Sequence, residues 1–114
     1  MIAGLFLFML ISSVLAAEWE VKVLDVYRNF YEDYPQFITK YLKSDGEGHF
    51  IEDVMKVTLK NSNKVFYVVF NSDLYQDALA SIEDLVKFKG KLIKKGKTPV
   101  IRANSDLKRE PAEE

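Results

Sequence analysis

The sequence predicts a small α+β fold, in which helices pack on one face of an antiparallel sheet. Residues 50–60 and 64–70 are rich in β-branched and aromatic residues, and the turn sequence Asn61-Ser-Asn63 separates them. This pattern predicts a β-hairpin. Before and after the hairpin, apolar residues recur at a spacing of four, which is typical of helices that bury one face. With one strand at each end, the order becomes βαββαβ, the ferredoxin-like arrangement.

The first sixteen residues predict a secretory signal peptide. They contain no charged side chain and are mainly apolar, and small residues follow at Ala16 and Ala17. Val14 and Ala16 suit the positions −3 and −1 of a cleavage site before Ala17. The segment is shorter than the roughly 20 apolar residues of a membrane-spanning helix. We therefore expect a cleaved signal over residues 1–16 and a secreted, extracellular protein.

The mature chain is long enough for one domain. Removing 16 residues from 114 leaves 98, and we assign residues 17–103 to a single globular α+β domain. The chain has no cysteine, so its stability must come from packing and not from disulfides. Residues 104–114 are polar and have no apolar periodicity, which predicts a disordered tail.

The start of the mature chain fits two structures. Trp19, Val21 and Val23 alternate with charged residues, which predicts a strand. Trp19 and Val23 also fit helical spacing with Val26. Both alternatives stay open for residues 18–24.

A helix is predicted from Asp25, because Val26, Phe30 and Tyr34 are four residues apart. Pro35 ends this helix, since proline lacks an amide hydrogen and disfavours helical geometry in the residue before it. A second short helical segment follows, and a loop rich in glycine and acidic residues separates it from the hairpin.

The chain after the hairpin predicts a third helix and a last strand. Asn71-Ser-Asp73 supplies side chains that can cap a helix. The apolar stripe that follows begins at Leu74 and continues to Ile93. Residues 99–102 are a short apolar segment that predicts the final strand.

One stretch resembles a known family. Residues 67–80, Tyr-Val-Val-Phe-Asn-Ser-Asp-Leu-Tyr-Gln-Asp-Ala-Leu-Ala, resemble the strand-to-helix entry of subtilisin-type propeptide inhibitors. The resemblance covers less than one sixth of the mature chain. It implies a protease inhibitor on a ferredoxin-like scaffold, for which the 104–114 tail is the candidate inhibitory segment.

The residue types needed for catalysis are few. The chain has one histidine, His49, and no cysteine, so a catalytic triad would have to be built around that imidazole. Zinc sites need several Cys or His ligands, and Asp45-Gly-Glu47 is only part of a calcium loop. Gly46 and Gly48 lack the third glycine of a phosphate-binding loop. We therefore expect no enzyme, no cofactor and no metal.

Charge is distributed unevenly along the chain. Residues up to 86 include seven basic and thirteen acidic side chains, whereas the residues from 87 onward include nine basic and four acidic ones. The basic excess lies in a segment predicted as an amphipathic helix over residues 82–97, with an apolar stripe of Phe88, Leu92 and Ile93. The candidate binding residues are its six lysines, Lys87, Lys89, Lys91, Lys94, Lys95 and Lys97.

The leading functional hypothesis is a small, secreted, non-enzymatic binding protein that contacts a protein or a polyanion such as a glycosaminoglycan. The alternative is a membrane-active or lipid-associating protein whose 82–97 helix inserts into an anionic membrane surface. Nucleic acid is not an expected partner, because the net charge is −1 and the basic segment has lysine without arginine.

Overall fold

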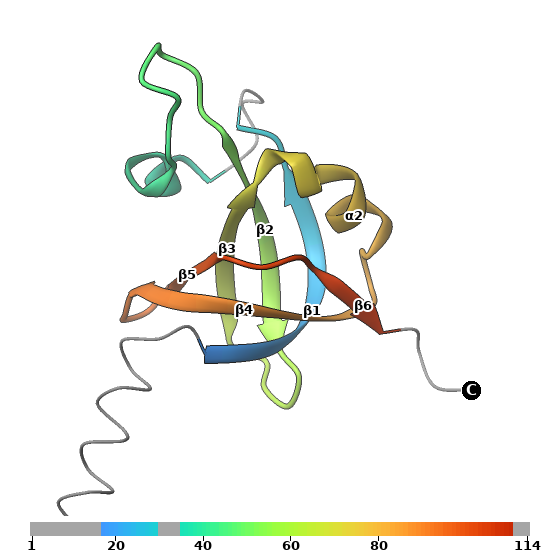
Figure 1. Cartoon of the computed structure of the whole chain (residues 1–114). Helices are drawn as coiled ribbons and strands as arrows, with labels where there is room; N and C mark the ends of the chain where they lie inside the picture. Colours follow the sequence, from blue (N-terminus) through green and yellow to red (C-terminus); the bar gives the residue numbers. More distant parts are fainter. Residues whose placement is uncertain (1–16, 30–34, 111–114) are drawn as a thin grey trace, which may run out of the picture.

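The computed structural model describes residues 17–29 and 35–110, which form a six-stranded sheet and three short helical segments (Figure 1). The strands are β1 (Ala17–Tyr27), β2 (Glu52–Leu59), β3 (Val65–Asn71), β4 (Leu85–Lys94), β5 (Val100–Ala103) and β6 (Lys108–Glu110). The helical segments are the 3₁₀ helices η1 (Gln36–Tyr41) and η2 (Ser72–Leu74) and the α-helix α2 (Tyr75–Ala80). Among these described residues, no helix has the length and apolar character needed to cross a membrane.

Five of the strands close into a barrel. They are hydrogen-bonded in the order β1-β2-β3-β5-β4, and β4 pairs again with β1. The strands β3 and β5 are parallel, and the other pairs are antiparallel. The predicted α+β fold, a ferredoxin-like sheet with helices on one face, is therefore wrong. The sheet closes on itself, so the core lies inside the barrel and not under helices.

Residues 17–27 form a strand, and the helix predicted from Asp25 is wrong as far as Tyr27. A β-bulge explains the error, because the pairing with β2 shifts register between Val23 and Asp25. The buried positions therefore move from Val23 to Val26, and this spacing of three resembles that of a helix. Residues 30–34 of the predicted helix lie outside the described residues.

The amphipathic helix predicted over residues 82–97 is also wrong. Most of that segment is β4, in which Val86, Phe88 and Gly90 are buried and alternate with more exposed lysines. The alternation is hidden in the sequence, because glycine at a buried position contributes no apolar side chain. A second bulge, at Ile93, then interrupts the alternation of inward-facing and outward-facing residues.

Several local predictions are confirmed. The strands β2 and β3 form an antiparallel hairpin around the turn 61–63. The side chain of Asn71 caps η2 by accepting the Asp73 backbone N–H at 2.8 Å. The predicted second helical segment is η1, and the predicted last strand is β5.

The chain remains ordered beyond residue 104, where a disordered tail was predicted. The strand β6 pairs with the first half of β4, and Leu107, just before it, is buried in the core. The prediction of a disordered tail is therefore wrong for residues 104–110. The buried side chain of Leu107 and the pairing of β6 with β4 hold this segment in place. Residues 111–114 lie outside the described residues.

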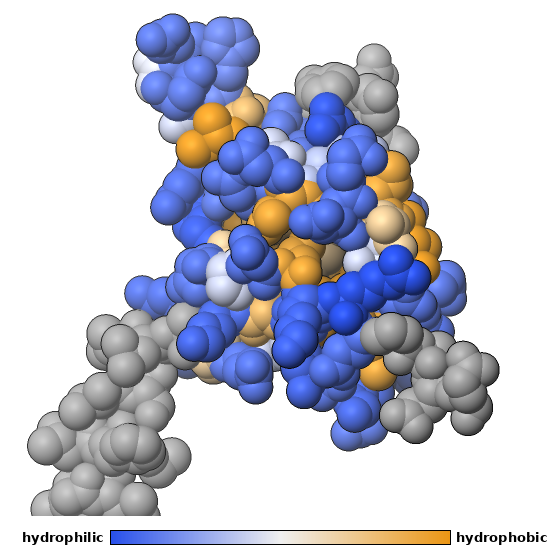
Figure 2. All heavy atoms as spheres, turned by 45° about the vertical axis from the view of Figure 1, so that its right-hand side comes forward, coloured by the Kyte–Doolittle hydropathy of each residue, from blue (hydrophilic) through white to orange (hydrophobic). Residues whose placement is uncertain are grey.

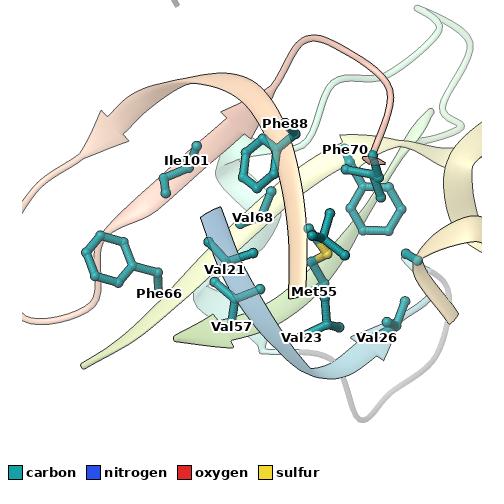
Figure 3. Packing of buried hydrophobic residues seen from close by; sticks show 13 residues of the cluster. Val21, Val23, Val26, Met55, Val57, Phe66, Val68, Phe70, Phe88 and Ile101 are labelled. Carbon is teal, nitrogen blue, oxygen red and sulfur yellow. The ribbon is translucent and has the colours of Figure 1, made fainter. Parts of the chain in front are cut away.

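The main core fills the barrel. Figure 3 shows side chains from five strands converging on the interior, among them Val21 from β1, Met55 from β2 and Phe88 from β4. Phe88 is only 3% exposed. The aromatic and β-branched content of the strands therefore serves to fill the barrel, at the close packing typical of protein interiors.

A second apolar cluster lies on the outer face of the sheet. Val54, Val69 and Val100, one from each of β2, β3 and β5, are fully buried there, together with Ile38 of η1. The six-residue η1 thus lies against the outside of the barrel, and Figure 1 shows it (teal) on the opposite side of the barrel from α2. Burial of Ile38 is what holds η1 to the sheet.

Candidate ligand-binding face

The six predicted binding lysines do not form one surface. Lys87, Lys89 and Lys91 alternate along β4 with the buried residues of that strand, so they face outward. Lys94 ends β4, and Lys95 and Lys97 belong to the turn that joins β4 to β5. The strand places Lys87 and Lys89 beside β1, and Lys87 also beside β6, whereas Lys91 is opposite Arg102 of β5.

The lysines in the first half of β4 have acidic neighbours. The ammonium group of Lys87 lies 3.2 Å from the Glu110 carboxylate of β6, and Lys87 is opposite Glu20 of β1. The hydrogen bond that Lys87 donates to the Glu110 carboxylate, with Glu20 as a further negative charge, raises the pKa of Lys87 above its ordinary value. Lys89 is opposite Glu18 on β1. This half of the strand is therefore electrostatically balanced.

The lysines at the other end of β4 have no such balance. No ion pair between described residues involves Lys91, Lys94, Lys95 or Lys97. The Lys94 ammonium donates a hydrogen bond to the Thr98 carbonyl at 3.3 Å, across the turn. Lys95 and Lys97 are exposed. Three lysines that form no ion pair with a described residue thus lie in or next to the β4–β5 turn.

An aromatic pair lies beside this turn. The rings of Phe37 in η1 and Tyr67 in β3 meet edge to face, with centroids 5.4 Å apart, and Phe37 is 42% exposed. The Tyr67 backbone N–H donates to the Pro99 carbonyl at 3.0 Å, which connects the pair to the end of the turn. Lys56 of β2 is the cross-strand neighbour of Tyr67.

Phe37, Tyr67 and Lys56 lie on the outside of the sheet, and the end of the β4–β5 turn adjoins them at Pro99. We take this area and the lysines of the turn together as one candidate surface. We call it the basic–aromatic face. It consists of Phe37, Lys56, Tyr67, Lys94, Lys95 and Lys97. Its last three lysines are among the six binding residues predicted from the sequence, whereas Phe37, Lys56 and Tyr67 are not among them. The alternation of Lys56 and Tyr67 with buried residues of the hairpin was the available signal.

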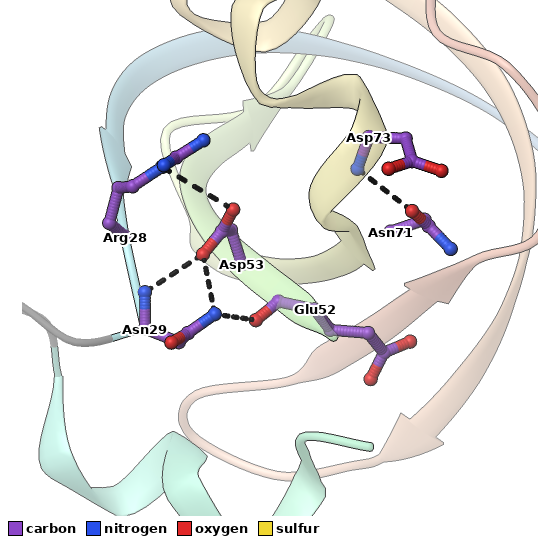
Figure 4. Close-up of polar contacts among 6 residues, drawn as sticks. All are labelled: Arg28, Asn29, Glu52, Asp53, Asn71 and Asp73. Carbon is purple, nitrogen blue, oxygen red and sulfur yellow. Dashed lines mark hydrogen bonds and ion pairs between the residues drawn. The ribbon is translucent and has the colours of Figure 1, made fainter. Parts of the chain in front are cut away.

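A polar network closes the end of the barrel near Asn29 (Figure 4). Asp53 is 1% exposed, and its Oδ1 accepts the Asn29 backbone N–H at 2.8 Å and the Asn29 side-chain N–H at 3.0 Å. Its Oδ2 lies 3.8 Å from the Arg28 Nε atom, and the Arg28 guanidinium stacks on the Tyr75 ring at 3.9 Å. These contacts join β1, β2 and α2, so the network is structural.

The single histidine is held by a loop carboxylate. His49 Nδ1 lies 3.2 Å from the Asp45 carboxylate in an exposed turn. Hydrogen bonds to that carboxylate, first from the Glu47 backbone N–H, lower the pKa of Asp45. Within the described parts of the chain, no hydroxyl group hydrogen-bonds to His49, and no group of three or more metal-ligating side chains is found.

The molecule also has shallow hollows. One of about 420 Å³ is lined by apolar Ile51 and Leu74 and by the charged residues Lys43, Asp73 and Arg102. On the face seen in Figure 2, apolar atoms reach the surface between hydrophilic residues. Mixed charges line the hollow, so it has no clear preference for an anionic or a cationic ligand.

Comparison with known proteins adds no assignment, because the chain matches no protein-family model, no curated protein and no solved structure.

Proposed function

We propose that this protein is a secreted, non-enzymatic binding module that holds an acidic polymer, such as a sulfated glycosaminoglycan, on its basic–aromatic face. The observation that carries the proposal is the contrast between the two ends of β4. Lys87 and Lys89 lie opposite glutamates, whereas Lys94, Lys95 and Lys97 make no ion pair with any described residue. Positive charge without an internal partner is available to an external one.

The physical chemistry favours a polymer over a small anion. One exposed ion pair contributes only about 0–1 kcal/mol, so useful affinity requires several contacts at once. The turn offers three lysines, and Lys56 adds a fourth on the sheet. A repeating polyanion can engage them together, and its attachment should weaken as salt screens the charges.

The aromatic pair supports a ligand that contains rings. Phe37 is partly exposed beside Tyr67, so it offers apolar surface that the C–H face of a sugar can cover. OB-folds, which are also five-stranded barrels, bind oligosaccharides and oligonucleotides on the face of their second and third strands, with the loops β1–β2 and β4–β5. This is an analogy of fold only.

We prefer this proposal to the membrane alternative. It required an amphipathic helix whose apolar stripe could leave the core, but Phe88 is buried inside the barrel and Leu92 packs against the same core. Inserting these side chains into a bilayer would require opening the barrel. The inhibitor alternative required a free tail, and the tail is paired in β6 as far as Glu110.

Heparin chromatography of the mature chain, residues 17–114, tests the proposal. Lys95→Gln/Lys97→Gln should elute at clearly lower salt than the wild type. The matched control, Lys87→Gln/Lys89→Gln, removes the same charge from the balanced half of β4 and should elute closer to the wild type. Equal shifts in both variants would indicate unspecific charge attraction, and no shift in the first variant would contradict the proposal. An acidic protein is tested by repeating the series with polyglutamate.

A further inference from the structure

We infer that the ion pair of Glu52 and Arg102 is a positioning clamp, which fixes η1 on the outer face of the barrel and so sets the aromatic half of the basic–aromatic face. The inference rests on the proposed function for its effect on ligand binding. The structural part of the clamp can be tested without a ligand.

The clamp joins two strands that are not neighbours. Glu52 begins β2 and Arg102 lies in β5, and β3 runs between them. The Arg102 Nε lies 3.0 Å from Glu52 Oε2, and Arg102 Nη2 lies 3.0 Å from Glu52 Oε1. The Glu52 side chain is 6% exposed and that of Arg102 is 23% exposed. Bidentate geometry of this kind fixes both side chains, because the guanidinium and the carboxylate are planar.

Glu52 and Arg102 each also form a hydrogen bond with one backbone group at the C-terminal end of η1. The Lys43 backbone N–H donates to Glu52 Oε1 at 2.8 Å. The Arg102 guanidinium donates from Nη2 to the Tyr41 carbonyl oxygen. The last residue of η1 and the chain just after it are therefore attached to the barrel by charge-assisted hydrogen bonds.

The helix η1 depends on such attachment. It is a six-residue 3₁₀ helix whose N-cap, Pro35, makes no side-chain capping bond, and short helical segments are unstable in isolation. Burial of Ile38 and Leu42 against the outer valine cluster holds its apolar side. The clamp also fixes the orientation of η1 on the sheet, because apolar contacts alone do not determine how a short helical segment is rotated. The orientation of Phe37 follows from it.

The main core is separate from the clamp. Glu52 is two residues from Val54 and Arg102 is two residues from Val100, so both side chains lie on the outer face of the sheet with those valines and not inside the barrel. A variant that loosens the clamp should therefore release η1 while the barrel stays folded. Replacing both charged residues avoids the strong destabilisation that follows when one buried charge loses its partner.

The test uses the double variant Glu52→Met/Arg102→Met of the mature chain, studied by NMR. We expect the ring-to-ring NOE between Phe37 and Tyr67 to disappear and amide exchange at Lys43 to speed up by at least tenfold. Exchange at Val21 and Val68, inside the barrel, should be unchanged. The matched control is Asp84→Met/Arg109→Met, which removes another arginine–carboxylate pair, 2.7 Å apart, and should leave both η1 signals as in the wild type.

A folded double variant that keeps the NOE and the slow Lys43 exchange would overturn the clamp. If that variant does not fold, Arg102→Lys serves instead. It keeps the charge opposite Glu52 but cannot form the planar two-point contact and also reach the Tyr41 carbonyl. An unchanged NOE and unchanged exchange at Leu42 and Lys43 in Arg102→Lys would equally overturn the inference.

Heparin elution separates this inference from the proposed function. If both are right, the clamp variant should lose about as much affinity as Phe37→Ala, without any change in the turn lysines. Loss of the η1 signals with unchanged heparin elution in all variants would leave the clamp standing and contradict the proposed ligand. Retained η1 signals with a heparin loss only in Lys95→Gln/Lys97→Gln would contradict the clamp alone.

Discussion

Gly90 is a position in β4 where the neighbouring residues leave no room for a side chain. A Cβ atom placed there would lie 2.8 Å from the Arg102 carbonyl oxygen and 3.0 Å from side-chain atoms of Ile101 and Phe88. The Trp19 indole N–H donates to the Gly90 carbonyl at 2.9 Å. The backbone of β4 is thus held on both sides, and no side chain fits.

We predict that Gly90→Ala destabilises the protein by about 1–3 kcal/mol, the usual cost of forcing an extra methyl group into a packed site. Urea unfolding followed by the fluorescence of Trp19, the one tryptophan, measures it. The control Lys91→Ala changes the next, outward-facing residue and should stay within about 0.5 kcal/mol of the wild type. If Gly90→Ala were as stable as the wild type, β4 would be able to move away from β5 and make room for the methyl group, which would contradict the prediction.

Glu83 is the only non-glycine residue with a positive φ, 77°, among residues 17–29 and 35–110. Its backbone N–H donates to the Val23 carbonyl at 2.8 Å, and Val23 in turn donates to the Asp84 carbonyl. These two bonds hold the turn before β4 in a left-handed conformation. Such a conformation costs an L-residue about 1–2 kcal/mol.

We predict that Glu83→Gly stabilises the protein by about 0.5–1 kcal/mol, because relief of this conformation exceeds the added chain entropy of glycine. The exposed ion pair between Glu83 and Lys22, 3.5 Å apart, contributes little. Thermal unfolding measures the change. Glu83→Gln loses the same charge but keeps the conformation, so it should not be stabilised. If both variants were more stable than the wild type, the stabilisation would come from loss of the negative charge and not from the backbone conformation.

At the scale of elements, β6 is the strand most dependent on charge. It has three residues, and its cross-strand partners are confined to the first half of β4. Ion pairs at its last and middle residues support it, from Lys87 to Glu110 and from Arg109 to Asp84. A strand this short has few backbone hydrogen bonds, so its attachment should respond to pH.

We predict that β6 detaches as the pH falls. The hydrogen bond from Lys87 lowers the pKa of Glu110 below its ordinary value of 4.5. The contribution of this pair is therefore present above 4.5 and is lost as the pH falls through the lower, folded-state pKa. Amide chemical shifts of residues 108–110 across an acid titration measure the change. Glu110→Gln removes the titrating group, so its shifts should differ from the wild type already at neutral pH and move less on acidification.

At the scale of the whole molecule, the barrel closes only when residues 17–22 pair with β4. Ala17 is opposite Gly90, and Lys22 is opposite Leu85. The predicted cleavage site before Ala17 therefore coincides with the beginning of β1. Cleavage a few residues later would remove Trp19, which packs against the core.

We predict that the protein secreted by a eukaryotic host begins at Ala17, which intact-mass measurement can determine. Ala16→Leu places a bulky residue at position −1 and should block processing at this site. Ala17→Leu, at position +1, should be processed normally. Secretion of a chain that keeps residues 1–16 would contradict the signal-peptide prediction.

The sequence by itself determined the local features of the fold. The hairpin of β2 and β3, the cap at Asn71 and the strand β5 follow from β-branched residues, turn residues and capping side chains. Each depends on residues close together in the chain. The rarity of residues for catalysis and the lysine-rich segment are likewise properties of composition, and three of the six lysines that it indicated belong to the basic–aromatic face.

The tertiary structure alone decided the closure of the barrel and the division of the lysines. The bulges in β1 and β4 interrupt the alternation that marks a strand, and their positions depend on the strands beside them. Lys87 is neutralised because β6 and β1 lie next to it, whereas Lys95 forms no ion pair with any residue that the structure describes. Pairing between distant segments sets both outcomes, so patterns confined to a few neighbouring residues could not indicate them.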